Sequence, residues 1–324
     1  MKNKRYLLDA IKNFQPEFIA AWEKAVSKSA NEVPITELTT HLRQGNLLSA
    51  IALVEASPES FIDVEDAVRQ AHRNGFDATA GAIPRIMRDG SPVVMRLSPR
   101  NFRAEAWLVN HSATLIKGLT ETARDTVRAH LVYGVENGIN PRKVALQLLG
   151  QKGRDGVRRG GVIGLTPKQL QTVQSYRAAL ESGDYSNALG RSLRNKRYDK
   201  MLKSGKKLDT ATVDKIVDSY SNNSLKYRAT VIAEQETRVA MAEARTETFR
   251  QTVEKGYLNN DEIRRFWITR RDSRVRDSHD RIPGMNKDGV NLNQPFNTPD
   301  GAVYDAPHGV GCRCYVDVRI TVNR

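Results

Sequence analysis

The sequence has few aromatic residues, only two cysteines and no long apolar run. Aromatic residues make up 6% of the 324 residues and hydrophobic residues 39%, so the chain can bury a core that is not rich in aromatic rings. No run of about eighteen apolar residues occurs, which excludes a membrane-spanning helix. The two cysteines, Cys312 and Cys314, are two positions apart, a spacing that does not easily close a relaxed disulfide. We therefore expect a protein made in a reducing compartment.

Sequence signals for secretion and for common hydrolases are also missing. The first residues, MKNKRYLLDAIKNFQPEFIAAW, mix charges with apolar positions and contain no uninterrupted apolar stretch or small-residue cleavage site. They predict a first amphipathic helix of the mature protein, not a signal peptide. A Walker loop, a Gly-x-Ser-x-Gly motif and a paired-carboxylate metal motif are absent, which argues against an enzyme.

The positive charge is concentrated in one central span. Of the net charge of +14, residues 142–207 carry +12, with sixteen Lys and Arg against four Asp and Glu. Clustered cations neutralise phosphates and release counterions, which favours nucleic-acid contact; a solvated surface that only keeps the protein soluble is the alternative. Aromatic residues are few in this span, so backbone contact is favoured over base stacking. The candidate nucleic-acid-binding residues are Arg154, Arg158, Arg159, Lys168, Arg191, Arg194, Lys196, Arg197, Lys200, Lys203, Lys206 and Lys207.

Apolar residues at three-to-four spacing predict a mainly α-helical chain. The long helix with apolar positions from Leu108 to Val135 ends at Gly138, before Asn140-Pro141. Residues 93–98 are a strand or a linker, and 152–166 and the Gly-, Asn- and Arg-rich stretch after 182 are loops. The other predicted helices are 1–28, 36–56, 63–74, 141–149, 167–182, 209–220 and 224–256.

The pattern changes after Gly256. RRFWITR (264–270) has strand-like alternation at Phe266 and Ile268, and YVDVRITV (315–322) alternates along its length. The fold class predicted is mainly α, with an elongated helical body and a small C-terminal α+β or β-rich domain. The predicted division is 1–100, then 101–256 with the basic span 142–207, then 257–324.

The side chains best suited to metal binding or acid–base chemistry gather near the C-terminus. Cys312 and Cys314 would point to one face of a strand and Arg313 to the other. Together with His279 and His308, the two thiols would supply the ligand set of a tetrahedral zinc site, although Cys-x-Cys is closer than the usual spacing. Two alternatives stay open. The cysteines could be packed as small hydrophobic residues with His308 capping a turn, or Cys312 or His279 could act as nucleophile or base with Asp272 orienting.

The acidic residues of this segment also have plain structural interpretations. The run of arginines from Arg270 to Arg276 beside Asp272, Asp277 and Asp280 could form a salt-bridged surface turn. Asp300 and Asp305, beside Gly301 and Pro307, are expected to be turn residues.

The order of these motifs resembles the phage Mu F-like head-morphogenesis family, the minor head proteins of tailed bacteriophages. The resemblance covers roughly residues 105–320. Its structural motif includes Trp267, Asp272, Arg276 and Glu236, the last within ATVIAEQETRVAMAEAR (229–245), where Thr237 and Ala240 also match. The other matching residues and segments are LTPKQLQTVQSYRAAL, KRYDKML, Ser273, Arg274, Val275, His279, Gly284, Pro295-Phe296, Pro307-His308 and Cys312-Arg313-Cys314.

The chain departs from the family pattern in two places. The family commonly has His-Pro-Asn directly before Cys-Arg-Cys, whereas His308 is followed here by Gly309-Val310-Gly311. Glu234 and Gln235 replace an Arg and a Thr of the helix motif. An exact ARTET is present at 244–248 but lies closer to Trp267 than the family spacing, so the alignment at 229–245 is preferred.

The resemblance implies a structural protein, not an enzyme. Its members lie in few copies inside the procapsid, associate with the portal vertex and influence DNA packaging or ejection. The implied partners are the portal protein, packaged double-stranded DNA and a capsid or scaffold protein, with no membrane at assembly. The location would be the virion interior, after assembly in the host cytoplasm. Residues 1–100 are then candidates for portal docking through amphipathic helices.

Two other functions compete with this interpretation. Similar tail domains occur fused to toxin modules, so a metal-dependent or Cys/His nuclease or hydrolase is the alternative. A DNA-binding scaffold unrelated to phages is the third. No cofactor is certain, and zinc is possible.

Overall fold

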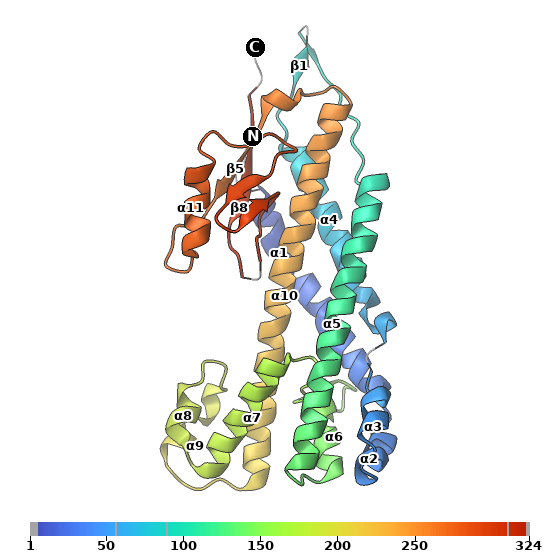
Figure 1. The fold of residues 1–324 in the computed structure, drawn as a ribbon, viewed down its shortest axis with the longest axis vertical. Coiled ribbons are helices and arrows are strands. Elements are labelled where there is room, and N and C mark those ends of the chain that lie inside the picture. The colour runs from blue at the N-terminus through green and yellow to red at the C-terminus, as the bar shows by residue number, and fades with distance from the viewer. Residues whose placement is uncertain (1–5, 56, 89, 310, 322–324) are drawn as a thin grey trace. The chain divides into compact units, whose positions relative to one another are not determined.

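The computed structural model describes residues 6–55, 57–88, 90–309 and 311–321 (Figure 1). The chain forms two compact units, each assembled from distant segments. Unit 1 consists of residues 1–18, 66–112 and 231–324, and unit 2 of residues 19–65 and 113–230. Four long helices contribute residues to both units, namely α1 (Tyr6–Glu32), α4 (Ile62–Ala82), α5 (Phe102–Glu136) and α10 (Thr210–Glu254). The division into three consecutive segments stays a prediction about function.

Unit 2 is built mainly from short helices around an aliphatic core. The rings of Tyr176 and Tyr220 stack in this core with centroids 4.3 Å apart. A two-stranded hairpin, β3 (Gln151–Lys152) with β4 (Arg158–Arg159), forms where a loop was predicted. The other elements are α2 (Ile35–Arg43), α3 (Leu47–Leu53), η1 (Pro58–Phe61), α6 (Pro141–Leu149), α7 (Pro167–Ser182), α8 (Tyr185–Gly190), η2 (Lys196–Tyr198) and α9 (Asp199–Lys203).

Unit 1 contains an antiparallel strand pair, β5 (Ile263–Ile268) and β8 (Tyr315–Ile320). Ile263 pairs with Ile320 and Ile268 with Tyr315, so the two strands align along their full length. A second hairpin joins β6 (Phe296–Thr298) to β7 (Gly301–Val303), and a third joins β1 (Met87–Arg88) to β2 (Ser91–Pro92). Helix α11 (Asp277–Met285) lies between β5 and β6 in the chain. The short helix η3 (Asn260–Glu262) precedes β5.

The mainly α prediction with a small C-terminal α+β part is confirmed. Among the described residues, no helix is long and apolar enough to cross a membrane.

Helix α10 is continuous where two helices, 209–220 and 224–256, were predicted (Figure 1). The polar run Ser221-Asn222-Asn223-Ser224 reads as a helix breaker because short polar side chains compete for backbone groups. Here Asn222 accepts the Gly160 N–H at 2.8 Å, and Asn223 donates to the Leu193 carbonyl at 2.9 Å. These side chains bond neighbouring loops, which leaves the helical ladder intact.

The predicted helix 36–56 is divided, and the loop after 182 is partly helical. Gly45 has a positive φ of 71°, which ends α2 before α3 begins at Leu47. Asp184 caps α8 by accepting the Asn187 N–H, and Leu202 of α9 is buried. Burial of single apolar side chains stabilises these short helices, which periodicity alone does not reveal.

The buried face of β5 is the opposite of the predicted one. Ile263, Arg265 and Trp267 are buried, whereas Phe266 and Ile268 are half-buried. Arginine reads as a surface residue, but Arg265 donates to the Tyr304 carbonyl at 2.7 Å and to the Asn291 and Gln294 carbonyls. Backbone acceptors therefore satisfy a guanidinium that is 1% exposed. In β8 the valines Val316 and Val318 are buried, and Val322 lies outside the described residues.

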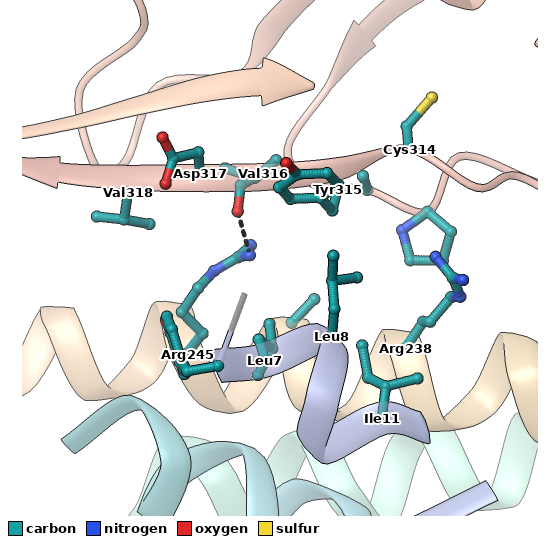
Figure 2. A pocket seen from close by; sticks show the side chains of 14 residues that line it. Leu7, Leu8, Ile11, Arg238, Arg245, Cys314, Tyr315, Val316, Asp317 and Val318 are labelled. Carbon is teal, nitrogen blue, oxygen red and sulfur yellow. Dashed lines mark hydrogen bonds between the residues drawn. The ribbon is translucent and has the colours of Figure 1, made fainter. Parts of the chain in front are cut away.

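The first turns of α1 pack against β8 and α10 within unit 1 (Figure 2). Leu7, Leu8 and Ile11 line a small cavity of about 30 Å³ together with Val316 and Val318. Further along α1 the apolar positions Phe14, Phe18 and Trp22 are also buried. The amphipathic face predicted from the sequence is therefore used inside the chain.

Candidate metal centre and basic span

The predicted cluster of cysteines and histidines forms inside unit 1. His279 lies in the first turn of α11, and Cys312 and Cys314 lie in the segment that leads into β8. All three side chains are buried, and both cysteines are free thiols. Figure 2 shows the Cys314 sulfur on the opposite side of β8 from Arg245 and Leu8. Both sulfurs lie near the same His279 nitrogen, although the strand on which the prediction placed the cysteines begins only at Tyr315.

The two sulfur atoms surround one nitrogen of His279. Its Nδ1 lies 3.5 Å from Cys312 Sγ and 3.7 Å from Cys314 Sγ. The three potential ligand atoms all lie within 4.8 Å of one another. The Cys312 N–H donates to the Gly309 carbonyl at 3.2 Å, which fixes the turn ahead of the pair. Two thiols and one imidazole are soft ligands of the kind that bind zinc.

The two thiols differ in acidity because each acts on the other. A hydrogen bond from the Cys314 thiol, together with neighbouring backbone donors, lowers the pKa of Cys312 to about 5. The adjacent Cys312 sulfur, and then burial, raise the pKa of Cys314 above its ordinary value. The Trp267 indole acts in the opposite direction and favours the Cys314 thiolate, although it does not outweigh them.

Aromatic rings cover the cluster. The Trp267 ring meets the His279 ring edge-on at 6.4 Å and the Phe296 ring edge-on at 5.4 Å. The indole nitrogen of Trp267 is buried and has no hydrogen-bond acceptor among the described residues. Exclusion of water by these rings strengthens electrostatic interactions inside the cluster.

His308 does not join the thiols. It belongs to a second cluster with Asp300 and His279, whose ligand atoms also lie within 4.8 Å of one another. The His308 ring is 5.6 Å from the His279 ring, and its side chain is 35% exposed. Three of the four proposed ligands are thus together, and the Gly309–Gly311 lengthening separates the fourth.

Asp272 binds an arginine. Its carboxylate forms a two-point ion pair with Arg313, one contact at 2.7 Å, and accepts the Arg274 N–H. The Arg313 guanidinium lowers the pKa of Asp272. Arg276 donates to the His308 carbonyl at 3.4 Å. This geometry gives Asp272 the role of holding the Cys-Arg-Cys segment, and it gives no support to Asp272 orienting a catalytic histidine.

Asp305 has a larger role than the predicted turn residue. Its carboxylate accepts hydrogen bonds from Arg245 at 2.6 and 2.5 Å, and from the Thr246 hydroxyl at 3.1 Å. Arg245 is 2% exposed and also donates to the Val316 carbonyl. Burial acts to lower the pKa of Arg245, but Asp305, Tyr6 and Glu243 together outweigh burial, so this pKa is raised.

The exact ARTET at 244–248 supplies these contacts. Besides Arg245 and Thr246, its Glu247 is buried and binds Arg103 at 3.0 Å. In the segment 229–245, which was the preferred match to the family motif, Glu236 contacts His111 instead. The distance between its carboxylate and His111 Nε2 is 2.7 Å. The structure thus favours the exact copy as the segment that fixes the C-terminal strands. The exact match of residues 244–248 to the family motif could have identified this segment from the sequence alone.

The basic span lies in unit 2, and several of its arginines are engaged. Arg159 pairs with Asp155 at 2.6 Å, and Arg194 pairs with Asp199 at 2.9 Å. Arg158 donates to the Gly150 carbonyl, and Arg191 to Asn187 and Ser175. Arg197 lies over the Tyr198 ring at 4.6 Å. These five side chains have structural roles inside the unit.

The lysines of the span differ from its arginines. Five of them are exposed and form no ion pair within 4.0 Å among the described residues, namely Lys196, Lys200, Lys203, Lys206 and Lys207. The hydrogen bond from Arg194, together with the charges of Lys203 and Lys196, lowers the pKa of Asp199. Lys168 and Arg154 are likewise exposed without a carboxylate in contact within the described part of the chain. Free ammonium groups at a surface are available to phosphates.

The comparison with protein families identifies a related family. The family model described as Phage Mu protein F like protein matches residues 125–317. No curated protein and no solved structure matches the chain. The match covers more than half of the chain, includes the basic span and the Cys-His cluster, and agrees with the resemblance carried by Trp267 to Cys314. The chain therefore belongs to the Phage Mu protein F-like family of phage head morphogenesis proteins.

Proposed function

We propose that this chain is a minor head protein that binds the portal vertex inside the capsid and contacts packaged double-stranded DNA. Family membership supports the head-morphogenesis role. The DNA contact rests on one observation, the group of exposed lysines between residues 196 and 207 that form no ion pair among the described residues.

The lysine group is suited to contact that does not depend on base sequence. Lys196 belongs to η2, Lys200 and Lys203 to α9, and Lys206 and Lys207 to the irregular segment before α10. Like charges this close repel one another unless a polyanion is near. Each phosphate that a lysine neutralises adds about 0.9 to the slope of log affinity against log salt. Five such contacts would therefore account for a slope of about 4 to 5.

Salt-dependent binding to duplex DNA tests this contact. The five lysines of the group are changed together to glutamine, and affinity is measured by fluorescence anisotropy over a range of salt. We expect the slope to fall by about 4 relative to the unchanged chain, and equally for unrelated duplex sequences.

A matched control removes the same charge elsewhere. Five exposed lysines outside the span are changed to glutamine, namely Lys12, Lys24, Lys28, Lys117 and Lys287. We expect this variant to keep nearly the full salt slope. Equal losses in both variants would show that net charge, and not the lysine group, governs binding, and would overturn the proposed DNA surface.

Portal docking by residues 1–100 must use side chains that stay exposed, because the apolar face of α1 is buried. Leu48 on α3 is 76% exposed, the largest exposed fraction of the large apolar residues described before residue 100. A Leu48→Asp variant is expected to weaken co-purification with the portal protein, while the five-lysine variant still co-purifies. Unchanged recovery of Leu48→Asp would contradict docking through α3.

A position at the portal vertex places the protein beside the entering and leaving genome. The proposed role is therefore in assembly, packaging or genome ejection, from the virion interior after assembly in the host cytoplasm. No membrane is required at assembly, and a capsid or scaffold protein is a further proposed partner. The proposed function requires no catalysis.

A further inference from the structure

We propose that unit 1 binds a zinc ion through His279 Nδ1, Cys312 Sγ and Cys314 Sγ, with His308 as the fourth ligand. The site would join α11 to the segment before β8. The inference does not depend on DNA or portal binding.

The spacing of the three atoms fits a tetrahedral metal. Zinc bonds of about 2.3 Å to sulfur and 2.0–2.1 Å to nitrogen, at tetrahedral angles, place S and N about 3.6 Å apart. The two observed separations are 3.5 Å and 3.7 Å. Two of the three edges of the expected tetrahedron that meet at the histidine nitrogen are therefore present.

Hydrogen bonding explains this arrangement less well. A neutral imidazole nitrogen without a proton has one lone pair and accepts one good hydrogen bond. Two thiols lie at nearly equal distance from the same Nδ1. The other thiol would then donate to the neighbouring sulfur, which is a weak acceptor, whereas a shared metal ion engages all three atoms directly.

A buried donor lies beside the thiols. The Trp267 N–H is buried and has no acceptor among the described residues, and its ring meets the His279 ring edge-on at 6.4 Å. Metal-bound sulfur carries negative charge and accepts such donors.

His308 is the natural fourth ligand. Its ring lies 5.6 Å from the His279 ring, and its side chain is 35% exposed. In the present conformer its Nε2 lies 4.0 Å from an Asp300 carboxylate oxygen, longer than a hydrogen bond. A closed Cys₂His₂ set is typical of structural zinc sites.

Zinc binding would be coupled to loss of the thiol protons. Each thiol that is still protonated loses its proton to solvent as its sulfur binds, so a site with two neutral thiols releases two protons when it binds Zn²⁺. No oxidant or reductant is needed. Since the thiolates must form, affinity should fall as the pH is lowered.

Metal analysis of the full chain is the first test. Protein purified from zinc-supplemented medium is expected to carry about one zinc ion per chain. The double variant Cys312→Ser/Cys314→Ser should lose it. Lys287→Gln is the control, because this side chain is exposed and lies outside the cluster; this variant should keep the metal.

The fourth ligand is tested separately. The metal-free chain is titrated with Co²⁺, and sulfur-to-cobalt charge-transfer absorption reports thiolate binding. His308→Gln is expected to weaken metal binding at least tenfold, whereas Asp300→Asn changes it little. Equal affinity of His308→Gln and the unchanged chain would overturn the assignment of His308.

Since a cysteine variant could fail to fold, the unchanged chain provides an independent measurement. Removal of metal by a chelator should lower the Tm by several degrees, and added zinc should restore it. Absence of zinc after purification, together with no Tm response and no cobalt absorption, would overturn the site.

Discussion

Arg245 on α10 and Asp305, sixty residues further along, form a two-point ion pair at 2.6 and 2.5 Å. The guanidinium is 2% exposed and also donates to the Val316 carbonyl of β8. One side chain therefore fixes α10, the loop before the Cys-Arg-Cys segment and β8 within unit 1. Arg245 is part of the exact ARTET segment, and its pairing with Asp305 accounts for an arginine at a buried position.

Removing the charge of Asp305 should be costly. Asp305→Asn keeps the acceptor for the Ala306 N–H but leaves the buried Arg245 without a counter-charge. We expect a loss of about 3 kcal/mol in the free energy of unfolding, measured in urea. The double variant Arg245→Met/Asp305→Asn should lose less, because no unpaired charge remains buried. A larger loss in the double variant would contradict this account.

Two glycines of α4 should respond in opposite ways to alanine. A Cβ on Gly75 would lie 2.6 Å from Met241 Cα on α10, whereas one on Gly81 would meet nothing within 4 Å. Gly75→Ala should therefore lower the free energy of unfolding by about 1–3 kcal/mol through overpacking. Gly81→Ala should raise it by up to about 1 kcal/mol by restricting the unfolded chain. Urea denaturation midpoints measure both, and equal effects would refute the close helix contact.

Periodicity predicted the helices well because most of them bury an apolar stripe. It failed where polar side chains take partners far along the chain. Asn222 and Asn223 bind loops and leave α10 unbroken, and Arg265 occupies a core position of β5 by donating to carbonyls. Such partners lie tens of residues away, so a local pattern cannot report them.

The candidate site was predictable in part. Spacing of two along an extended chain placed Cys312 and Cys314 on one face, and the structure brings His279 to them. The fate of His308 depended on the turn through Gly309 and Gly311, whose positive φ angles a sequence pattern does not specify. Asp305 was missed because its partner Arg245 lies on another element.

Asp218 should make stability depend on pH. Burial, and then the neighbouring Asp214, raise the pKa of Asp218 to about 6, against the opposing effects of Arg177 and Lys143. The raised pKa means that the folded chain holds this proton more tightly than the unfolded chain does. Ionisation of Asp218 therefore lowers the free energy of unfolding. This loss is absent below about pH 4, grows as the pH rises to about 6, and is complete above that pH.

Asp218→Asn is therefore expected to raise the free energy of unfolding by about 2 kcal/mol at pH 7 and by little at pH 4. Asp214→Asn is the control, since Asp214 holds Arg177 at 2.6 Å and Lys143 at 3.2 Å. That variant should lower stability at pH 7. Urea denaturation at both pH values measures these free energies. An equal increase for Asp218→Asn at pH 4 and pH 7 would rule out ionisation of Asp218 as the cause.

The nuclease or hydrolase alternative predicts that the chain cleaves DNA, whereas a structural head protein leaves DNA intact. Because Asp272 is held by Arg313 and the Cys-His cluster is closed by Trp267 and Phe296, we expect no hydrolysis of single- or double-stranded DNA with Mg²⁺ or Zn²⁺. His279→Ala and Asp272→Asn should leave labelled DNA as intact as the unchanged chain does. Asp272→Asn should also keep the Cys-His metal content. Cleavage by the unchanged chain that both substitutions abolish would instead establish an Asp-His catalytic pair, and the proposal of a purely structural head protein would fail.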